Sequence, residues 1–235
     1  MYIKKIKLHN YRRFKDLEIS FNERRNILVG DNESGKSSIL EAIDLTARGS
    51  RHRVEEIGIE TLFNVEVIKD FMAGSRHLDE LPSLYVELYL ADIIEEGLEG
   101  KCNSEEVVTY GIRMTIERND SLSRQTQTVL QSKNASFPFE FYNITFLTFS
   151  EEPYNGYTKK VKTIFLDNSI IGNDYALNGY ISTIYDATLN QIEQLATKHV
   201  YGTAKTTFKN DVLASFNSRL PEGYAFSVKN TGKNC

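Results

Sequence analysis

Residues 27–38 carry the feature that most limits what this chain can fold into. They read ILVGDNESGKSS and match G-x-x-x-x-G-K-[ST], the pattern of a phosphate-binding loop. The fixed positions of the pattern are Gly30, Gly35, Lys36 and Ser37. Such a loop works between a strand and a helix, and both flanks fit. We therefore expect a buried parallel strand at Ile27–Val29 and a helix from Ser37 to near Gly49, where glycine favours a left-handed cap.

A loop of this kind captures anions with its backbone. Its glycines let successive N–H groups point to one place, where the positive end of the helix dipole also lies. Lys36 adds a mobile positive charge for the β and γ phosphates, and the Ser37 hydroxyl would complete the oxygen shell of Mg²⁺. The sequence thus predicts that ATP and Mg²⁺ bind at Gly30, Asp31, Asn32, Glu33, Ser34, Gly35, Lys36, Ser37 and Ser38.

The composition is that of an ordinary globular protein. The 235 residues are 40% hydrophobic and 26% charged, enough for one domain or one domain with an appended lobe. No 18-residue apolar run predicts a membrane span, and residues 1–7 alternate like a strand rather than a signal peptide. Cys102 and Cys235 form no C-x-x-C motif. We therefore expect a reduced, cytoplasmic protein with no membrane partner.

Charge is unevenly distributed along the chain. Residues 1–53 hold 12 Lys/Arg against 7 Asp/Glu, residues 54–108 hold 3 against 14, and residues 109–235 hold 13 against 11. The basic end coincides with the phosphate-binding loop, and part of its charge compensates bound nucleotide. The surplus that would contact DNA phosphates is Arg48, Arg51 and Arg53, for which exposed loop charge is the other interpretation.

Periodicity predicts the remaining elements. Tyr2–Leu8 and Leu17–Phe21 form a hairpin-like pair, and residues 61–73 form a short amphipathic helix ended by Gly74. Antiparallel strands with one wet face follow at Ser83–Leu90, Val107–Glu117, Thr126–Leu130 and Phe139–Phe149. The acidic stretch 95–106 between them predicts a solvated loop.

Beyond residue 167 the pattern changes to helices. Residues 180–199 and 203–220 predict a helical hairpin, and Ala225–Val228 predicts a further strand. We therefore expect three parts: a P-loop ATP-binding lobe with a β-meander at 1–170, a helical lobe at 171–220, and the start of a further strand at 221–235.

The segment Tyr2–Phe14 followed by Gly30–Ser37 resembles the opening of the ABC-type ATPases of the SMC/RecF/OLD group. Those proteins begin with a strand, an N-[FY]-[RK]-x-[FY] turn, a second strand and G-x-N-x-x-G-K-[ST]. The matching residues here are Asn10, Tyr11, Arg12, Phe14 and Asn32. A weaker similarity to RecF continues at Gly49–Arg53, where that family has an arginine-bearing loop, and at residues 144–153 and 163–167.

The resemblance implies an α/β fold: the N-terminal lobe of an ABC/SMC-type P-loop head, with an antiparallel β subdomain and a helical hairpin. It also implies a head that dimerises around two nucleotides and acts on or near DNA, in repair or anti-phage defence. A nuclease domain or partner is possible. It places Arg12 and Arg13 in a turn that approaches the nucleotide, so each either touches a phosphate or the facing subunit, or is a solvated turn arginine.

Heads of this group also need an L-S-x-G-[GEQ] signature, and four apolar residues followed by Asp and a catalytic Glu. Neither occurs after residue 170. Residues 146–151 and 164–167 match the second motif only in part, and we interpret both as core strands meeting a turn. We therefore expect this chain to be the N-terminal half of a head that binds ATP but hydrolyses it poorly, with ATPase activity in the full-length protein.

Other interpretations stay open. Residues 150–154 are the positional candidate for the loop that ABC proteins place beside Mg²⁺, although they offer glutamate rather than glutamine. A P-loop kinase or GTPase would share the phosphate-binding loop, but the N-K-x-D motif of GTPases does not occur. A non-hydrolysing interaction module, in which ATP only holds a dimer together, is the main alternative to an enzyme.

Overall fold

The computed structural model describes residues 1–132, 136–155 and 161, together with parts of the segment 184–219. The chain divides into two units, Met1–Phe165 and Leu166–Cys235. In the second unit, η4 (Phe208–Leu213) is a π-helix and α8 (Ala214–Asn217) is an α-helix, and both fall in the segment predicted to be the second helix of a hairpin. Residues 200–202, between the two predicted helices, are described only in part, and the predicted strand at Ala225–Val228 lies outside the described residues.

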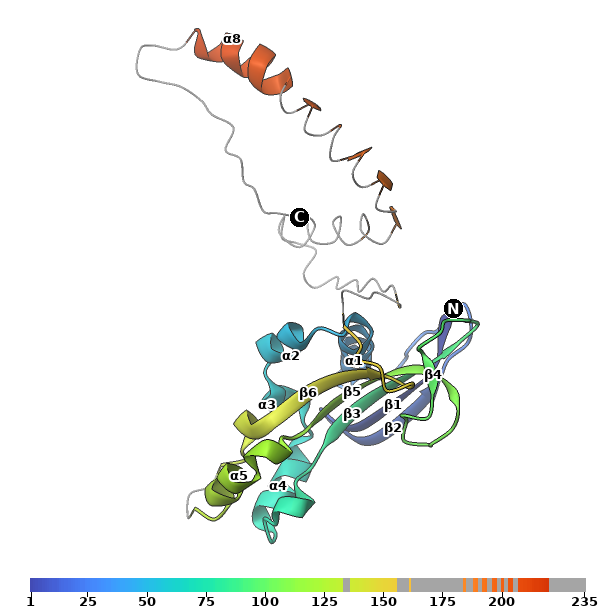
Figure 1. Ribbon diagram of the computed structural model, residues 1–235, viewed down its shortest axis with the longest axis vertical. Helices are drawn as coiled ribbons and strands as arrows, with labels where there is room; N and C mark the ends of the chain where they lie inside the picture. Colours follow the sequence, from blue (N-terminus) through green and yellow to red (C-terminus); the bar gives the residue numbers. More distant parts are fainter. Residues whose placement is uncertain are drawn as a thin grey trace. The chain divides into compact units, whose positions relative to one another are not determined.

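The first unit is built on an antiparallel sheet (Figure 1). Its order is β2-β1-β3-β5, and β5 also pairs with β4 and β6. The strands are β1 (Tyr2–Tyr11), β2 (Phe14–Ser20), β3 (Leu84–Ala91), β4 (Glu99–Gly100), β5 (Thr109–Arg118) and β6 (Tyr142–Thr148). The predicted hairpin is confirmed, with register from Lys5 opposite Ser20 to Tyr11 opposite Phe14. A two-residue turn, Arg12–Arg13, joins its strands.

Helices and short 3₁₀ turns connect the strands. They are α1 (Lys36–Arg48), α2 (Arg51–Ile57), α3 (Ile59–Leu62), α4 (Val65–Ala73), η1 (Leu78–Glu80), η2 (Asp120–Leu122), α5 (Ser123–Leu130) and η3 (Phe139–Phe141). The end of α1 is confirmed, because Gly49 adopts the left-handed conformation with φ 59°. The helix predicted at 61–73 is divided, since Asn64 has an extended backbone and caps α4 with its side chain.

Two predicted strands are wrong. Residues 126–130 belong to α5, and the buried Thr126 and Leu130 lie four residues apart, which is the helical period. The segment Ile27–Val29 is irregular, with Ile27 76% and Val29 89% exposed. No strand among the described residues pairs with it, and an isolated parallel strand cannot satisfy its backbone groups. Only Leu28 packs against the core.

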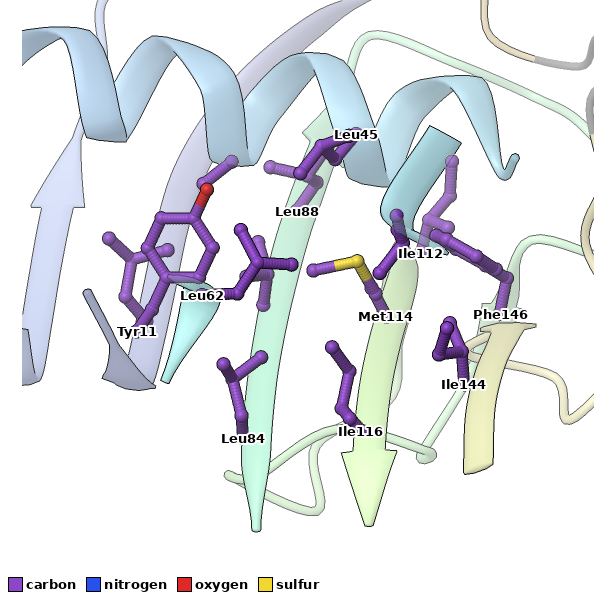
Figure 2. Packing of buried hydrophobic residues seen from close by; sticks show 14 of the residues in the cluster. Tyr11, Leu45, Leu62, Leu84, Leu88, Ile112, Met114, Ile116, Ile144 and Phe146 are labelled. Atoms are coloured by element: carbon purple, nitrogen blue, oxygen red, sulfur yellow. The ribbon is translucent and has the colours of Figure 1, made fainter. Parts of the chain in front are cut away.

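The core lies between α1 and the sheet. Helix α1 runs across the strands, with Leu45 directed at the side chains of β3 and β5 (Figure 2). Leu45, Leu88, Ile112 and Met114 are at most 2% exposed. Full burial of a side chain of this size contributes about 1.5–3 kcal/mol. Packing of this kind fixes the position of α1, and therefore of its N-terminal end, relative to the sheet.

The opposite face of the sheet is not open to water at β3, where the prediction of one wet face is wrong. The stretch 95–106 covers it: Leu98 is fully buried, and Ser104 donates to the buried carboxylate of Glu87 from its backbone N (2.7 Å) and its Oγ (2.8 Å). Glu105 pairs with Lys5 and with Lys7. The hydrogen bond from Lys5 lowers the pKa of Glu105. The prediction of a solvated loop is confirmed for its glutamates, all of which are exposed, whereas Leu98 and Asn103 are buried.

The cap of α4 gives a test of the fold. The Asn64 side chain accepts hydrogen bonds from the backbone N of Glu66 (3.0 Å) and of Val67 (3.2 Å). Asn64→Ala should lower the free energy of unfolding by about 1 kcal/mol, measured by urea denaturation, whereas Asn64→Asp should retain most of the stability. Equal losses in the two variants would show that the cap does not stabilise this region.

Candidate nucleotide-binding site

A pocket of about 370 Å³ opens where the β1–β2 turn meets the N-terminal end of α1. It is lined by Arg12, Arg13, Asn32, Glu33, Ser34, Gly35, Lys36, Ser37 and Ser38. Two segments that are separated in sequence, the turn and the phosphate-binding loop, thus form one site. Of the residues predicted to bind ATP, only Gly30 and Asp31 do not line this pocket.

Gly30 and Asp31 instead hold the Lys36 side chain in place through their backbone carbonyl oxygens. The Lys36 ammonium donates to the carbonyl oxygens of Gly30 (2.7 Å) and Asp31 (2.6 Å) and to the Oγ of Ser34 (3.2 Å). No carboxylate in the described part of the chain forms an ion pair with Lys36. Its positive charge is therefore held over the loop by neutral acceptors and is available to an anion.

The first turn of α1 supplies backbone donors. Gly35 is the N-cap, no side chain caps the helix, and the first turn contains no acidic residue. The first intrahelical hydrogen bond runs from the N of Ile39 to the O of Gly35. The N–H groups before Ile39 thus have no partner within the helix, and the positive dipole end favours an anion beside them.

Gly35 is also the point where turn and loop touch. Its φ is +93°, and a Cβ at this position would lie 2.4 Å from the Cζ of Phe14 and 2.9 Å from the Cδ of Arg13. A side chain is excluded both by this backbone conformation and by this contact. Glycine at position 35 therefore lets the hairpin turn pack directly on the phosphate-binding loop.

Arg12 is fixed from two sides. Its backbone has φ 49° and donates from its N to the O of Leu62 (2.6 Å). Its guanidinium forms an ion pair with Glu41 of α1 (2.6 Å), and the same carboxylate oxygen accepts from the Tyr11 hydroxyl (3.0 Å). Burial, with a further contribution from the Glu41 carboxylate, raises the pKa of Tyr11 far above its ordinary value, so the phenol remains a donor. The Tyr11 hydroxyl points toward α1 in Figure 2.

Sequence reasoning did not assign Glu41 to the site. Glu41 lies four residues after Ser37, so the helical period places both on one face of α1. This spacing is the sequence pattern from which Glu41 could have been assigned to the site. Tyr11 was recognised only as part of the turn motif. Its fully buried ring and its bond to Glu41 show that it connects the turn to α1.

The arginines predicted to bind DNA lie on α1 and α2. Each pairs with a carboxylate of its own helix: Arg48 with Asp44 (2.6 Å), Arg51 with Glu55 (2.8 Å) and Arg53 with Glu56 (3.2 Å). Their side chains are 41%, 60% and 56% exposed. The prediction of an arginine-bearing loop at Gly49–Arg53 is wrong, because α2 begins at Arg51 and the Ser50 side chain caps it.

The sequence 146–151 is a core strand meeting a turn, as interpreted. Phe149 is fully buried, and Glu151 is an exposed turn residue at φ 67°. Residues 164–167 lie outside the described residues. The loop 150–154 stays a prediction as the candidate beside Mg²⁺; its last residue, Tyr154, contacts Gly49 and donates to the O of Ala47. Ala47 lies about 15 Å along α1 from Ser37.

The described residues contain no group of three or more His, Cys, Asp or Glu side chains that could hold a metal ion by themselves. A magnesium ion at Ser37 would therefore depend on phosphate oxygens and water for its other ligands. Among the described helices, none contains an apolar stretch of the length that a membrane span requires.

Comparison with known proteins gives the family. The AAA ATPase domain matches residues 1–210. The DNA replication and repair protein RecF of Exiguobacterium sp. is 41% identical over 56 residues, which are 24% of this chain and 15% of RecF. RecF of Clostridium acetobutylicum is 45% identical over 56 residues, again 24% of this chain and 15% of the relative.

A longer match is to the Septu protein PtuA of Bacillus mycoides, 27% identical over 188 residues, which are 74% of this chain and 26% of PtuA. This chain thus spans about a quarter or less of the length of these relatives. A solved structure from work on the ATP-driven dimerization and DNA-stimulated activation of SMC ATPases has 16% identity and a TM-score of 0.41. The alignment covers 78% of this chain and 99% of the chain in the solved structure.

The family match extends across the hairpin, the phosphate-binding loop and the whole described sheet, and the RecF matches agree with the resemblance seen in the N-terminal motifs. The chain belongs to the AAA ATPase domain family, and its fold is that of an SMC/RecF-like ABC-type ATPase head.

Proposed function

We propose that this chain binds Mg²⁺·ATP through Gly30–Ser38, with Arg12 and Arg13 of the β1–β2 turn beside the phosphates. One observation carries the proposal: the open N-terminus of α1, the Lys36 ammonium and both turn arginines border a single pocket. Adenine nucleotide is the ligand that membership of an ATPase family favours. The pocket gathers positive charge and backbone donors, as a triphosphate requires.

The residues present fit magnesium in the same site. Ser37 lines the pocket at the first turn of α1, the position from which a hydroxyl supplies one oxygen ligand in phosphate-binding loops. When bound, the metal would neutralise charge on the phosphates. The protein's own contribution is to orient the phosphate chain with Lys36, the backbone donors and the turn arginines.

We further propose that ATP binding serves a larger DNA-processing ATPase, in which nucleotide-bound heads dimerise. The names of RecF, a DNA replication and repair protein, and of the SMC ATPase work support this direction. Within it, residues 1–170 act as the ATP-binding lobe, 171–220 as a helical lobe and 221–235 as the start of a further strand. Repair or anti-phage defence, with a nuclease domain or partner, is the context proposed for the whole protein.

The alternative is a non-hydrolysing module in which ATP stabilises a dimer. Neither the signature nor the Asp-Glu motif of these heads occurs after residue 170, which favours binding without turnover by this chain alone. Steady-state ATP hydrolysis by the full-length protein, with and without DNA, separates the two functions. Sustained turnover excludes the module, and its absence despite tight ATP binding excludes the enzyme.

The nucleotide site is tested at Lys36. Lys36→Ala removes the cation at the centre of the loop and should weaken binding of Mg²⁺·ATP by roughly 10- to 100-fold, as expected for loss of charge-assisted hydrogen bonds. Isothermal titration calorimetry measures the affinity. Lys69→Ala, which removes an exposed lysine of α4, is the matched control and should bind like the parent. Equal affinities of the parent and Lys36→Ala would place nucleotide elsewhere.

DNA contact is proposed at the arginines near the C-terminal end of α1 and on α2. Exposed ion pairs are worth at most about 1 kcal/mol, so DNA phosphates displace the carboxylates from Arg48, Arg51 and Arg53 at little cost. Arg51→Glu/Arg53→Glu should reduce both DNA affinity and the slope of log affinity against log salt, measured by fluorescence anisotropy. Lys69→Glu/Arg124→Glu changes the net charge equally on α4 and α5. If both variants show the same slope, these arginines are not the DNA site.

A further inference from the structure

Arg12 lines the pocket, but the residue that holds its guanidinium does not. Glu41 does not line the pocket, yet its carboxylate oxygen lies 2.6 Å from a terminal nitrogen of the Arg12 guanidinium. We propose that Glu41, oriented by Tyr11, is a positioning residue that holds the Arg12 guanidinium at the phosphates of bound nucleotide. The inference rests on the proposed function of the site.

The anchor and the phosphate donors belong to the same helix. Glu41 lies one turn after Ser37 on α1, whose N-terminal backbone would bind the phosphates. The Glu41–Arg12 pair therefore fixes the turn arginine relative to those donors. Tyr11 reinforces this geometry, because its buried hydroxyl donates to the oxygen of Glu41 that Arg12 also contacts.

The arrangement of Arg12 is costly, which argues that it is more than incidental surface pairing. Its backbone lies in the left-handed region, which is uncommon for a residue other than glycine. Its Nε is buried without a hydrogen-bond partner. Strain and an unpaired buried donor both oppose folding, and they persist where the surrounding structure requires one conformation.

Two effects of Glu41 on nucleotide binding have opposite signs. Its negative charge repels phosphate and weakens binding. Its ion pair with Arg12 already holds the guanidinium in one conformation, so less side-chain conformational entropy is lost when nucleotide binds. The repulsion is small, because Arg12 and the Tyr11 hydroxyl already compensate the carboxylate and Glu41 does not border the pocket. Ordering dominates, so removing the charge of Glu41 should weaken ATP binding about 2- to 10-fold.

The test is a double-mutant cycle on the whole chain, with ATP affinity measured by calorimetry at constant salt. Glu41→Gln should weaken binding in the parent and have no effect in the Arg12→Ala background, because the effect acts through Arg12. Asp44→Asn is the matched control: it removes one carboxylate of α1 that pairs with an arginine remote from the pocket, and it should leave ATP affinity unchanged. Tighter binding by Glu41→Gln, or an equal loss in both backgrounds, would overturn the proposal.

Two further measurements keep the outcome interpretable. If Glu41→Gln does not fold by circular dichroism, Tyr11→Phe removes one hydrogen bond to Glu41 and keeps the ring; its loss of affinity should also vanish in the Arg12→Ala background, and persistence there overturns the proposal. Lys36→Ala separates this inference from the function beneath it. If Lys36→Ala weakens binding and Glu41→Gln does not, only the positioning role is wrong, whereas unchanged binding by Lys36→Ala removes the site itself.

Discussion

The contact between the β1–β2 turn and Gly35 is the constraint on which the site depends. At this point Phe14 and Arg13 approach the loop so closely that no Cβ fits, and the backbone of Gly35 is left-handed. The contact puts two arginines beside the open end of α1. Without it the phosphate-binding loop would be an isolated turn with one lysine. With it, cations from one segment and backbone donors from another border a single pocket.

Burial on the other side of α1 makes that contact possible. The helix is held against β3 and β5 by fully buried side chains such as Leu45, Leu88 and Ile112, so its N-terminal end has a fixed place over the sheet. The segments that build the pocket then adopt less favourable backbone conformations, with φ 49° at Arg12 and 69° at Glu33. Core packing stabilises the unit, and part of that stability maintains a strained, positively charged site.

Sequence patterns predicted the parts of this fold that local interactions determine. The hairpin, α1 and its glycine cap follow from alternation, helical spacing and the conformational preference of Gly49. The strand at Ile27–Val29 could not be settled in this way, because a parallel strand exists only if a neighbouring strand pairs with it, and none of the described strands does. Likewise, alternation at 126–130 predicted a strand where burial follows a helical period.

The residues of the site likewise fall into those that local sequence patterns predict and those that only the fold brings together. Its loop residues are contiguous and were recognisable from their spacing, but Glu41 belongs to the site only because the turn folds onto α1 and brings Arg12 within 2.6 Å of it. The glutamates of the stretch 95–106 are exposed as predicted, but its contacts with Glu87, Lys5 and Lys7 could not be predicted, since these partners lie on strands distant in sequence. Contacts between distant segments decide which polar residues are solvated and which are structural.

Nuclear magnetic resonance during titration with Mg²⁺·ATP tests most directly whether turn and loop form one phosphate site. The backbone amides of Gly35–Ser38 and the side-chain Nε–H of Arg12 should shift together with a single affinity, because all border or adjoin the same pocket. Shifts confined to a different pocket, such as the one lined by Phe137 and Phe139, with Gly35–Ser38 and Arg12 unchanged, would contradict a nucleotide site at the junction of turn and loop.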